Sequence, residues 1–300
     1  MSISLLYFLT GQLMWGLLPA FWRLLGDLSP LYILAARILF AALLGYVIIA
    51  ALGKREMIRS AMKNPPLLGR LLTASVIVTA NWGLYIYAVN TGHILQTSLA
   101  YFMNPIVCLA LSSLLFKESL GPWQKASLAT ALMGMAASMI LFGGIPWLSL
   151  AICFTFSGYS LTKKKVALDG DVSVFFESLF MTIPSAAFVL WSEMNHTGAA
   201  GVLSGWEWLL LPATGLFTAL PLMFFSAGIR GISFASASVL MYMAPSIQTF
   251  IGFLYGETMS PIILINFCFI LVAVVFFVIG TLRHTKEMNE KIRASVRKDA

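Results

Sequence analysis

Residues 81–107 read NWGLYIYAVNTGHILQTSLAYFMNPIV and lie between plainly apolar segments. The stretch nevertheless carries three Asn, one Gln, one His, three Tyr and a Pro. In hydrocarbon each unpaired polar group is costly, so each of these side chains needs a partner or a polar surrounding. The stretch therefore poses the question of what so many polar groups do inside a membrane.

The composition of the whole chain identifies an integral membrane protein. Of 300 residues, 59% are hydrophobic and 10% are charged, and the mean hydropathy is +0.89. Soluble domains carry roughly 25% charged residues, and no soluble core would bury this much apolar sequence. The three Cys lie in apolar runs without metal-ligand spacing, so we expect packing residues there, no metal site and no cofactor.

The pattern of apolar runs predicts an all-α integral membrane protein with ten transmembrane helices. A span needs ~20 largely apolar residues, and Gly, Pro, Ser and Asn punctuate the chain between runs of that length. The first run lacks a basic region before it, so we expect a retained span and no cleaved signal. The predicted helices cover residues 3–25, 30–52, 67–91, 94–116, 122–142, 146–166, 172–192, 206–229, 232–255 and 260–282.

The basic residues favour one orientation in the membrane. With a cytoplasmic N-terminus, all but two of the 19 Lys and Arg fall in cytoplasmic loops or in the C-terminal tail. The two exceptions are Arg23, near an outside end, and Arg37, within a span. This asymmetry predicts that both termini are cytoplasmic. Topology and contact with anionic lipid then account for the net charge of +7, and we expect no nucleic-acid partner.

The second half of the chain echoes the first at a nearly constant offset. The matching pairs are Thr79/Thr218, Ala88/Ala227, Gly92/Gly231, Met103/Met243, Pro105/Pro245 and Glu118/Glu257. Each copy holds five spans, an odd number, so the second copy must be inverted, as is typical of secondary transporters. We expect repeat 1 over residues 1–143, repeat 2 over residues 144–282 and a basic cytoplasmic tail over residues 283–300.

Several polar and aromatic side chains fall near the middle of their spans. Trp15, Asn81, Asn104 and Tyr242 each lie about halfway along, ~15 Å from either surface. Tyr85 shares a helix face with Asn81, and Tyr101 shares one with Asn104. Secondary transporters bind solutes at this depth. The alternatives are that the amides bond neighbouring helices and that the aromatic rings pack in the core.

Two charged residues also lie within spans. Arg37 is ~12 Å below the outer boundary, and Glu177 is ~9 Å above the inner one. An intramembrane Arg costs roughly 2.5–3.5 kcal/mol on insertion scales, so it should find a partner or a wet cavity. Glu177 would reach Arg37 only if the second and seventh spans are neighbours; otherwise it is expected to extend to the interface. If Arg37 faces a cavity, it would attract a carboxylate.

Residues near span ends are expected to have structural roles. Glu118 and Glu257 are interpreted as turn and capping groups, and the run Lys163–Lys165 as a determinant of topology. An interfacial aromatic belt is expected to include Trp22, Tyr87, Trp206 and Trp208.

Five segments carry a resemblance to a known family. They are WGLLPAFWR (15–23), residues 81–106, YSLTKKK (159–165), FFESLFMTIP (175–184) and ALPLMFF (219–225) with the following YMAP (242–245). With them the sequence resembles, from about residue 3 to residue 282, the RarD family of EamA-type permeases in the drug/metabolite transporter superfamily. The resemblance implies two inverted five-helix repeats around a central cavity. By motif it implies these candidate substrate-binding residues: Trp15, Pro19, Asn81, Tyr85, Asn90, Tyr101, Asn104, Tyr159 and Tyr242, to which we add Arg37.

The chain departs from the family pattern at three ionisable positions. Tyr32 and Ala36 stand where Glu and His are frequent, and Gln96 stands where a Glu is usual. Proton coupling through those groups is therefore not expected, and facilitated or exchange transport gains weight.

The sequence thus predicts a secondary transporter in a bacterial cytoplasmic (inner) membrane. We expect an exporter of small metabolites, such as amino acids or amphipathic drug-like compounds, that works by alternating access as a monomer or weak homodimer. Small solutes and membrane lipid are the expected partners. The alternatives are a channel and a non-transporting sensor or partner subunit. An enzyme is not expected, because the sequence lacks the metalloprotease and serine-hydrolase motifs and any paired aspartates.

Overall fold

The computed structural model describes residues 3–116, 120–142, 145–163, 166, 168–229 and 240–299, and all regular structure in these ranges is helical. In the first half the helices are α1 (Ile3–Arg23), α2 (Pro30–Ala51), α3 (Arg55–Met62), α4 (Pro65–Asn90), α5 (Ile94–Phe116) and α6 (Pro122–Phe142). The second half contains α7 (Trp147–Lys163), α8 (Gly170–Met194), α9 (Ala199–Val202), the 3-10 helix η1 (Gly205–Leu209), α10 (Leu210–Ile229), α12 (Met243–Leu254) and α13 (Pro261–Asp299).

Local sequence explains where the early helices begin. The Ser29 side chain accepts a hydrogen bond of 3.2 Å from the Tyr32 amide, and Pro30 occupies the first turn of α2. Asn64 caps α4 in the same way ahead of Pro65. Both starts follow the preference for an oxygen-bearing cap followed by proline. Gly92, with φ of +75°, turns the chain between α4 and α5. Residues 81–107 therefore form parts of two consecutive helices.

The helix positions match most of the apolar runs and differ at several ends. Within the described ranges, six helices are long and apolar enough to cross a membrane by length and composition. The short helices α3 and α9 were not predicted, because they lie in loops that carry no apolar run, whereas η1 and α10 together occupy the predicted helix over 206–229. The last helix continues through the polar tail to Asp299. The predicted helix over 232–255 lies partly outside the described residues, and its described part contains α12.

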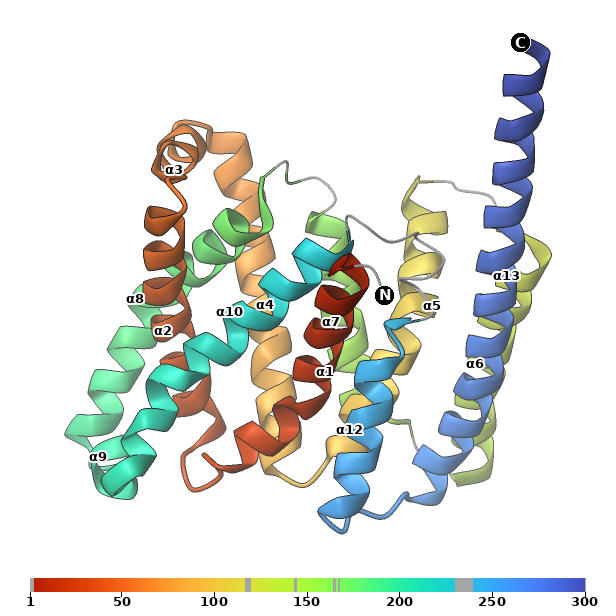
Figure 1. The fold of residues 1–300 in the computed structure, drawn as a ribbon. Helices are drawn as coiled ribbons and strands as arrows, with labels where there is room; N and C mark the ends of the chain where they lie inside the picture. The colour runs from red at the N-terminus through yellow and green to blue at the C-terminus, as the bar shows by residue number, and fades with distance from the viewer. Residues whose placement is uncertain are drawn as a thin grey trace.

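Helices from the two halves of the chain are interleaved (Figure 1). Helix α1 of the first half packs against α10 and α12 of the second half. Helix α7 of the second half packs against α4 and α5 of the first half. Two further pairs join the halves, α2 with α8 and α6 with α13. Backbones approach closely at Gly228 against Phe8 and at Gly215 against Phe40, where a Cβ atom would collide with backbone atoms. Small residues at such crossings are typical of helix packing in membranes.

Candidate functional site

Arg37 occupies the interior at the crossing of α2 with α10. Its side chain is buried, with the whole residue 5% exposed, and its Nε donates a hydrogen bond of 2.8 Å to Thr218 Oγ1. The guanidinium carbon lies 4.2 Å from the ring centre of Trp82 and 5.1 Å from that of Trp22. No carboxylate of the described residues forms an ion pair with it. The positive charge is thus held by two indole faces and one hydroxyl.

Two tyrosines complete this neighbourhood. Tyr85 and Tyr101 lie near Arg37, and their rings meet edge to face with centres 5.8 Å apart. Tyr101 also contacts Phe156 of α7, at 5.9 Å between ring centres. We name as the arginine–aromatic cluster the five residues Trp22, Arg37, Trp82, Tyr85 and Tyr101. They come from α1, α2, α4 and α5, and Thr218 adds a contact from the second half.

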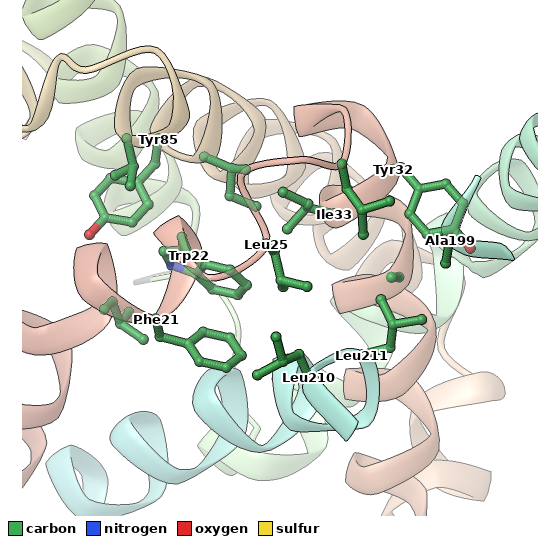
Figure 2. Close-up of a cluster of buried hydrophobic side chains, with 14 of the residues drawn as sticks. Phe21, Trp22, Leu25, Tyr32, Ile33, Tyr85, Ala199, Leu210 and Leu211 are labelled. Carbon is green, nitrogen blue, oxygen red and sulfur yellow. The ribbon is translucent and has the colours of Figure 1, made fainter. Parts of the chain in front are cut away.

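Two members of the cluster carry polar atoms with no hydrogen-bond partner in the described structure. They are the indole nitrogen of Trp22 and the hydroxyl of Tyr85, both buried (Figure 2). A buried donor without an acceptor costs roughly 1–3 kcal/mol, so such groups are rare and call for an explanation. Sequence analysis placed Trp22 in an interfacial belt, which is wrong: the side chain is fully buried, because α10 and the α1–α2 turn cover it.

A second polar group surrounds Glu177, which is also fully buried. Its carboxylate accepts hydrogen bonds from Lys163 Nζ (2.7 Å), Tyr159 Oη (2.8 Å) and Ser173 Oγ (3.0 Å). We call these four residues the Lys163–Glu177 network. The second and seventh predicted spans are indeed neighbours, yet Glu177 pairs with Lys163 and not with Arg37. Glu177 is fully buried, so the expectation that it extends to the interface was wrong, and the pairing with Arg37 that the sequence left open does not form.

The deep amides bond other helices. Asn81 Nδ2 donates to the Ile152 carbonyl (2.8 Å) and to Thr155 Oγ1 (3.0 Å), and both acceptors belong to α7. Asn104 Oδ1 accepts a hydrogen bond of 2.8 Å from Ser157, also in α7. These contacts join the first half of the chain to the second. They match the helix-bonding alternative that the sequence left open for these amides.

The other candidate residues lie in several places. Trp15 packs beside the arginine–aromatic cluster, with its ring 5.1 Å from Phe225, and Pro19 is buried in the same helix. Tyr159 belongs to the Lys163–Glu177 network. Tyr242 stacks on Phe102 in a separate core region, at 5.8 Å between ring centres. Asn90 ends α4 with both amide atoms buried and without a hydrogen-bond partner among the described residues. The candidates thus do not form one continuous set.

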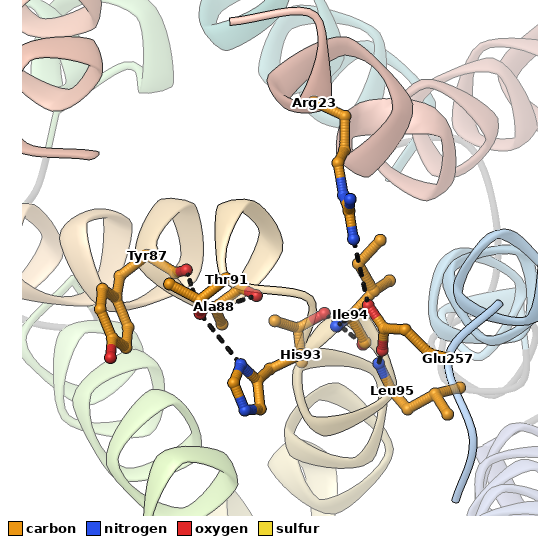
Figure 3. Close-up of polar contacts among 9 residues, drawn as sticks. Arg23, Tyr87, Ala88, Thr91, His93, Ile94, Leu95 and Glu257 are labelled. Carbon is orange, nitrogen blue, oxygen red and sulfur yellow. Dashed lines mark hydrogen bonds and ion pairs between the residues drawn. The ribbon is translucent and has the colours of Figure 1, made fainter. Parts of the chain in front are cut away.

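At the turn between α4 and α5 the halves are joined by a carboxylate (Figure 3). Glu257 accepts hydrogen bonds from the backbone amides of Ile94 (2.8 Å) and Leu95 (2.9 Å) and lies 3.8 Å from Arg23. A carboxylate at a helix N-terminus satisfies free amides and complements the helix dipole. The capping role predicted for Glu257 is confirmed, although it caps α5 and not its own helix. Glu118 lies outside the described residues.

A further polar contact between the halves involves the connection after α2. Lys54 Nζ lies 2.8 Å from Asp169 and 2.7 Å from Asp171, at the start of α8. The hydrogen bonds that Lys54 donates to the two carboxylates raise the pKa of Lys54 above its ordinary value of 10.5. The sequence places this lysine only in a cytoplasmic loop, because nothing along the chain connects it with residues more than a hundred positions away.

Known proteins resemble the chain along nearly its whole length. A model of the EamA-like transporter family matches residues 2–140. The "Uncharacterized transporter YojE" of Bacillus subtilis (strain 168) is 36% identical, with 91% of this chain and 93% of that protein covered. "Protein RarD" of Streptomyces exfoliatus is 33% identical, with 97% and 93% covered. The chain belongs to the RarD family of EamA-type permeases.

The RarD family extends to more distant relatives of this chain. "Protein RarD" of Escherichia coli (strain K12) is 27% identical over 91% of the chain and 93% of that protein. A solved structure titled "Crystal structure of protein" is 21% identical with a TM-score of 0.59, covering 92% of this chain and 97% of that one, and supports the fold alone. This RarD-family chain is therefore a multi-pass membrane protein of a bacterial transporter family.

Proposed function

We propose that this RarD-family permease is a secondary transporter that exports small metabolites across the bacterial inner membrane by alternating access. The proposal includes ten transmembrane helices in two inverted repeats, over residues 1–143 and 144–282, and cytoplasmic termini. Two related halves that open alternately to either side provide the physical basis of such transport.

The contacts between helices of the two halves support the inverted repeats, because the contacts in one half correspond to those in the other. If α1 corresponds to α7, α4 to α10 and α5 to α12, the contacts of α1 with α10 and α12 become the contacts of α7 with α4 and α5. The pairs α2–α8 and α6–α13 each map onto themselves. A two-fold relation between the halves would produce this pattern of contacts.

The observation that carries the proposal is the buried Arg37 at the boundary of the two halves, which forms no ion pair with any residue that the structure describes. A charge at this depth is expensive, and intramembrane ionisable groups commonly mark substrate pathways. Aromatic faces beside it offer stacking surface for the apolar part of a solute. We place the substrate at the arginine–aromatic cluster, with Trp15 and Pro19 at its border. In this arrangement Asn81 and Asn104 fix the surrounding helices.

Two polar contacts between the halves fit alternating access. Glu257 bonds the start of α5 near Arg23 at the proposed outer end, and Lys54 bonds Asp169 and Asp171 at the proposed inner end. Because Arg23, Lys54 and Asp169 are partly exposed, ion pairs there contribute roughly 0–1 kcal/mol each and can form and break within a transport cycle.

Solute counterflow in proteoliposomes tests the proposal. The unmodified protein should accumulate a labelled solute from a panel of aromatic metabolites with saturable kinetics, and Arg37→Gln should lower the initial rate at least ten-fold. Arg59→Gln is the matched control, since Arg59 is an exposed residue of α3 paired only with Glu56. Non-saturable flux would favour a channel. No flux of any solute, or equal rates in the two variants, would contradict the proposal.

A further inference from the structure

We propose that the arginine–aromatic cluster selects organic carboxylate anions over zwitterions and cations of the same skeleton. The inference rests on the proposed function for its biological setting, but it concerns binding and can be measured without transport. It follows from the chemical character of the groups that remain unpaired in the cluster.

Within the described part of the chain, the guanidinium of Arg37 has two terminal nitrogens that are free to bind a ligand. Its Nε is used by Thr218 at 2.8 Å, and no hydrogen bond joins its two terminal nitrogens to another described residue. Those nitrogens form one edge of a planar fork whose geometry matches a carboxylate with two parallel N–H···O bonds. Thr218, itself held by a bond of 2.8 Å to the Thr214 carbonyl, fixes the orientation of this fork.

Two polar atoms beside Arg37 add further hydrogen-bond donors to the cluster. The indole nitrogen of Trp22 can only donate a hydrogen bond, and the Tyr85 phenol is a ready donor. Both are buried, at 0% and 3% exposure, and neither finds an acceptor among the described residues. Because the unused groups of the cluster can all donate, the partner that satisfies them must be rich in acceptors. A carboxylate has two oxygens with about four lone-pair sites.

In their described residues, the helices around the cluster offer no free carboxylate to pair with the ammonium group of a ligand. The helices that build or surround the cluster are α1, α2, α4, α5, α7, α8 and α10, and all their carboxylates lie on α8. Asp171 pairs with Lys54, Glu177 pairs with Lys163, and Glu193 bonds Tyr32 and the amides that begin α9. An ammonium group placed beside Arg37 would therefore meet repulsion without compensation. An amino acid is disfavoured relative to the matching carboxylic acid that lacks the amine.

Aromatic rings form the apolar surroundings of the Arg37 guanidinium. The two indole rings lie against the guanidinium, and the Tyr85 and Tyr101 rings meet edge to face beside it. Aromatic walls of this kind favour a flat apolar body through stacked or edge contacts. The expected ligand is thus an aryl-substituted monocarboxylate.

Calorimetric titration of the purified full-length protein in detergent micelles tests the inference with four probes on a phenyl–propyl or phenyl–ethyl skeleton. The probes are 3-phenylpropanoate (anion), phenylalanine (zwitterion), phenethylamine (cation) and 3-phenylpropan-1-ol (neutral). At pH 7 we expect the carboxylate to bind with a Kd at least ten-fold lower than each of the others. Equal or tighter binding of phenylalanine or phenethylamine would overturn the inference.

Three variants locate the preference. Arg37→Gln should abolish the difference between 3-phenylpropanoate and 3-phenylpropan-1-ol, and Arg37→Lys should restore part of it. Tyr85→Phe removes one hydroxyl and should raise the Kd of the carboxylate about three-fold or more. Tyr87→Phe is its matched control, because Tyr87 lies on the same helix and is half exposed. An unchanged preference in Arg37→Gln would place the anion site elsewhere and defeat the inference.

These experiments can contradict the binding inference and the transport proposal independently of each other. A carboxylate preference in micelles without counterflow in proteoliposomes would leave the binding inference intact and contradict the proposed transport. Saturable counterflow of phenylalanine, together with a Kd for phenylalanine equal to or lower than that for 3-phenylpropanoate, would support transport and defeat the charge preference.

Discussion

The Lys163–Glu177 network and the arginine–aromatic cluster differ in whether a buried charged group has a charged partner. Lys163 lies 2.7 Å from a fully buried carboxylate, which also accepts hydrogen bonds from Tyr159 and Ser173. Arg37 has one hydroxyl and two indole faces as neighbours and no acidic partner among the described residues. The network satisfies its own charges, whereas the cluster leaves one positive charge and several donors unsatisfied.

This difference separates a structural role from a binding role. A complete ion pair with additional hydrogen bonds has nothing left to offer a solute, and removing one partner leaves a buried charge alone. An incomplete site is expensive to maintain, so it persists where a ligand completes it. We therefore expect substitutions in the network to affect mainly stability and substitutions in the cluster to affect mainly binding.

The largest effect on stability is expected from breaking the paired site. Glu177→Gln should lower the free energy of unfolding by about 2 kcal/mol, because the buried acceptor of three hydrogen bonds loses its charge and the partly exposed Lys163 loses its counter-ion. Arg37→Gln should change the same quantity by no more than about 1 kcal/mol, since the loss of one hydrogen bond is offset by removal of an unpaired charge. Reversible denaturation in mixed detergent micelles measures both.

A rescue variant makes that prediction sharper. Lys163→Met combined with Glu177→Leu removes both charges and should recover part of the lost stability, because Tyr159 and Ser173 then lack the carboxylate that accepted their hydrogen bonds. If Glu177→Gln is as stable as the unmodified protein, or if Arg37→Gln is the less stable variant, the contrast between the two regions does not hold.

A smaller effect is expected at the single hydrogen bond of Arg37. Thr218→Val keeps the side-chain shape but removes the acceptor for Arg37 Nε, so the free energy of unfolding should fall by about 1 kcal/mol. The guanidinium also loses its fixed orientation, and the Kd for 3-phenylpropanoate should rise several-fold. Thr214→Val is the control one turn away, because this hydroxyl bonds only the Leu211 carbonyl of its own helix. A similar rise of the Kd in the control would show that the effect is not specific to Arg37.

The smallest effect is expected at Lys54, outside the membrane-spanning helices. Its raised pKa means that its pairing with Asp169 and Asp171 stabilises the fold fully below about pH 10, and that this stability is lost as the pH rises through the folded-state pKa. Because the groups are partly exposed, Lys54→Gln should cost only about 0.5 kcal/mol at pH 8.

Unfolding midpoints between pH 8 and pH 11.5 check the sign of this effect. The gap between the unmodified protein and Lys54→Gln should be constant up to about pH 10 and should shrink above it. A gap that widens with rising pH would contradict the assigned pairing.

Sequence patterns predicted those features that depend on short stretches of chain. The start of α2 at Ser29-Pro30, the turn at Gly92 and the start of α5 at Ile94 follow from capping, glycine and apolar run length. Arg37 stood out because an isolated charge in an apolar run is rare. Trp22 and Trp82 were missed as neighbours of Arg37, since aromatic residues are common in such helices and nothing in their spacing points to a cation.

The sequence by itself determined the membrane class, the family and most helix boundaries, because span length, capping and composition act locally. The tertiary structure alone decided that Glu177 pairs with Lys163, that Trp22 is buried under Arg37, and that Asn81 and Asn104 bond α7. Partners of this kind depend on which helices lie side by side and how each is rotated. Every span is apolar almost all round, so its own periodicity does not specify the face that meets a given neighbour.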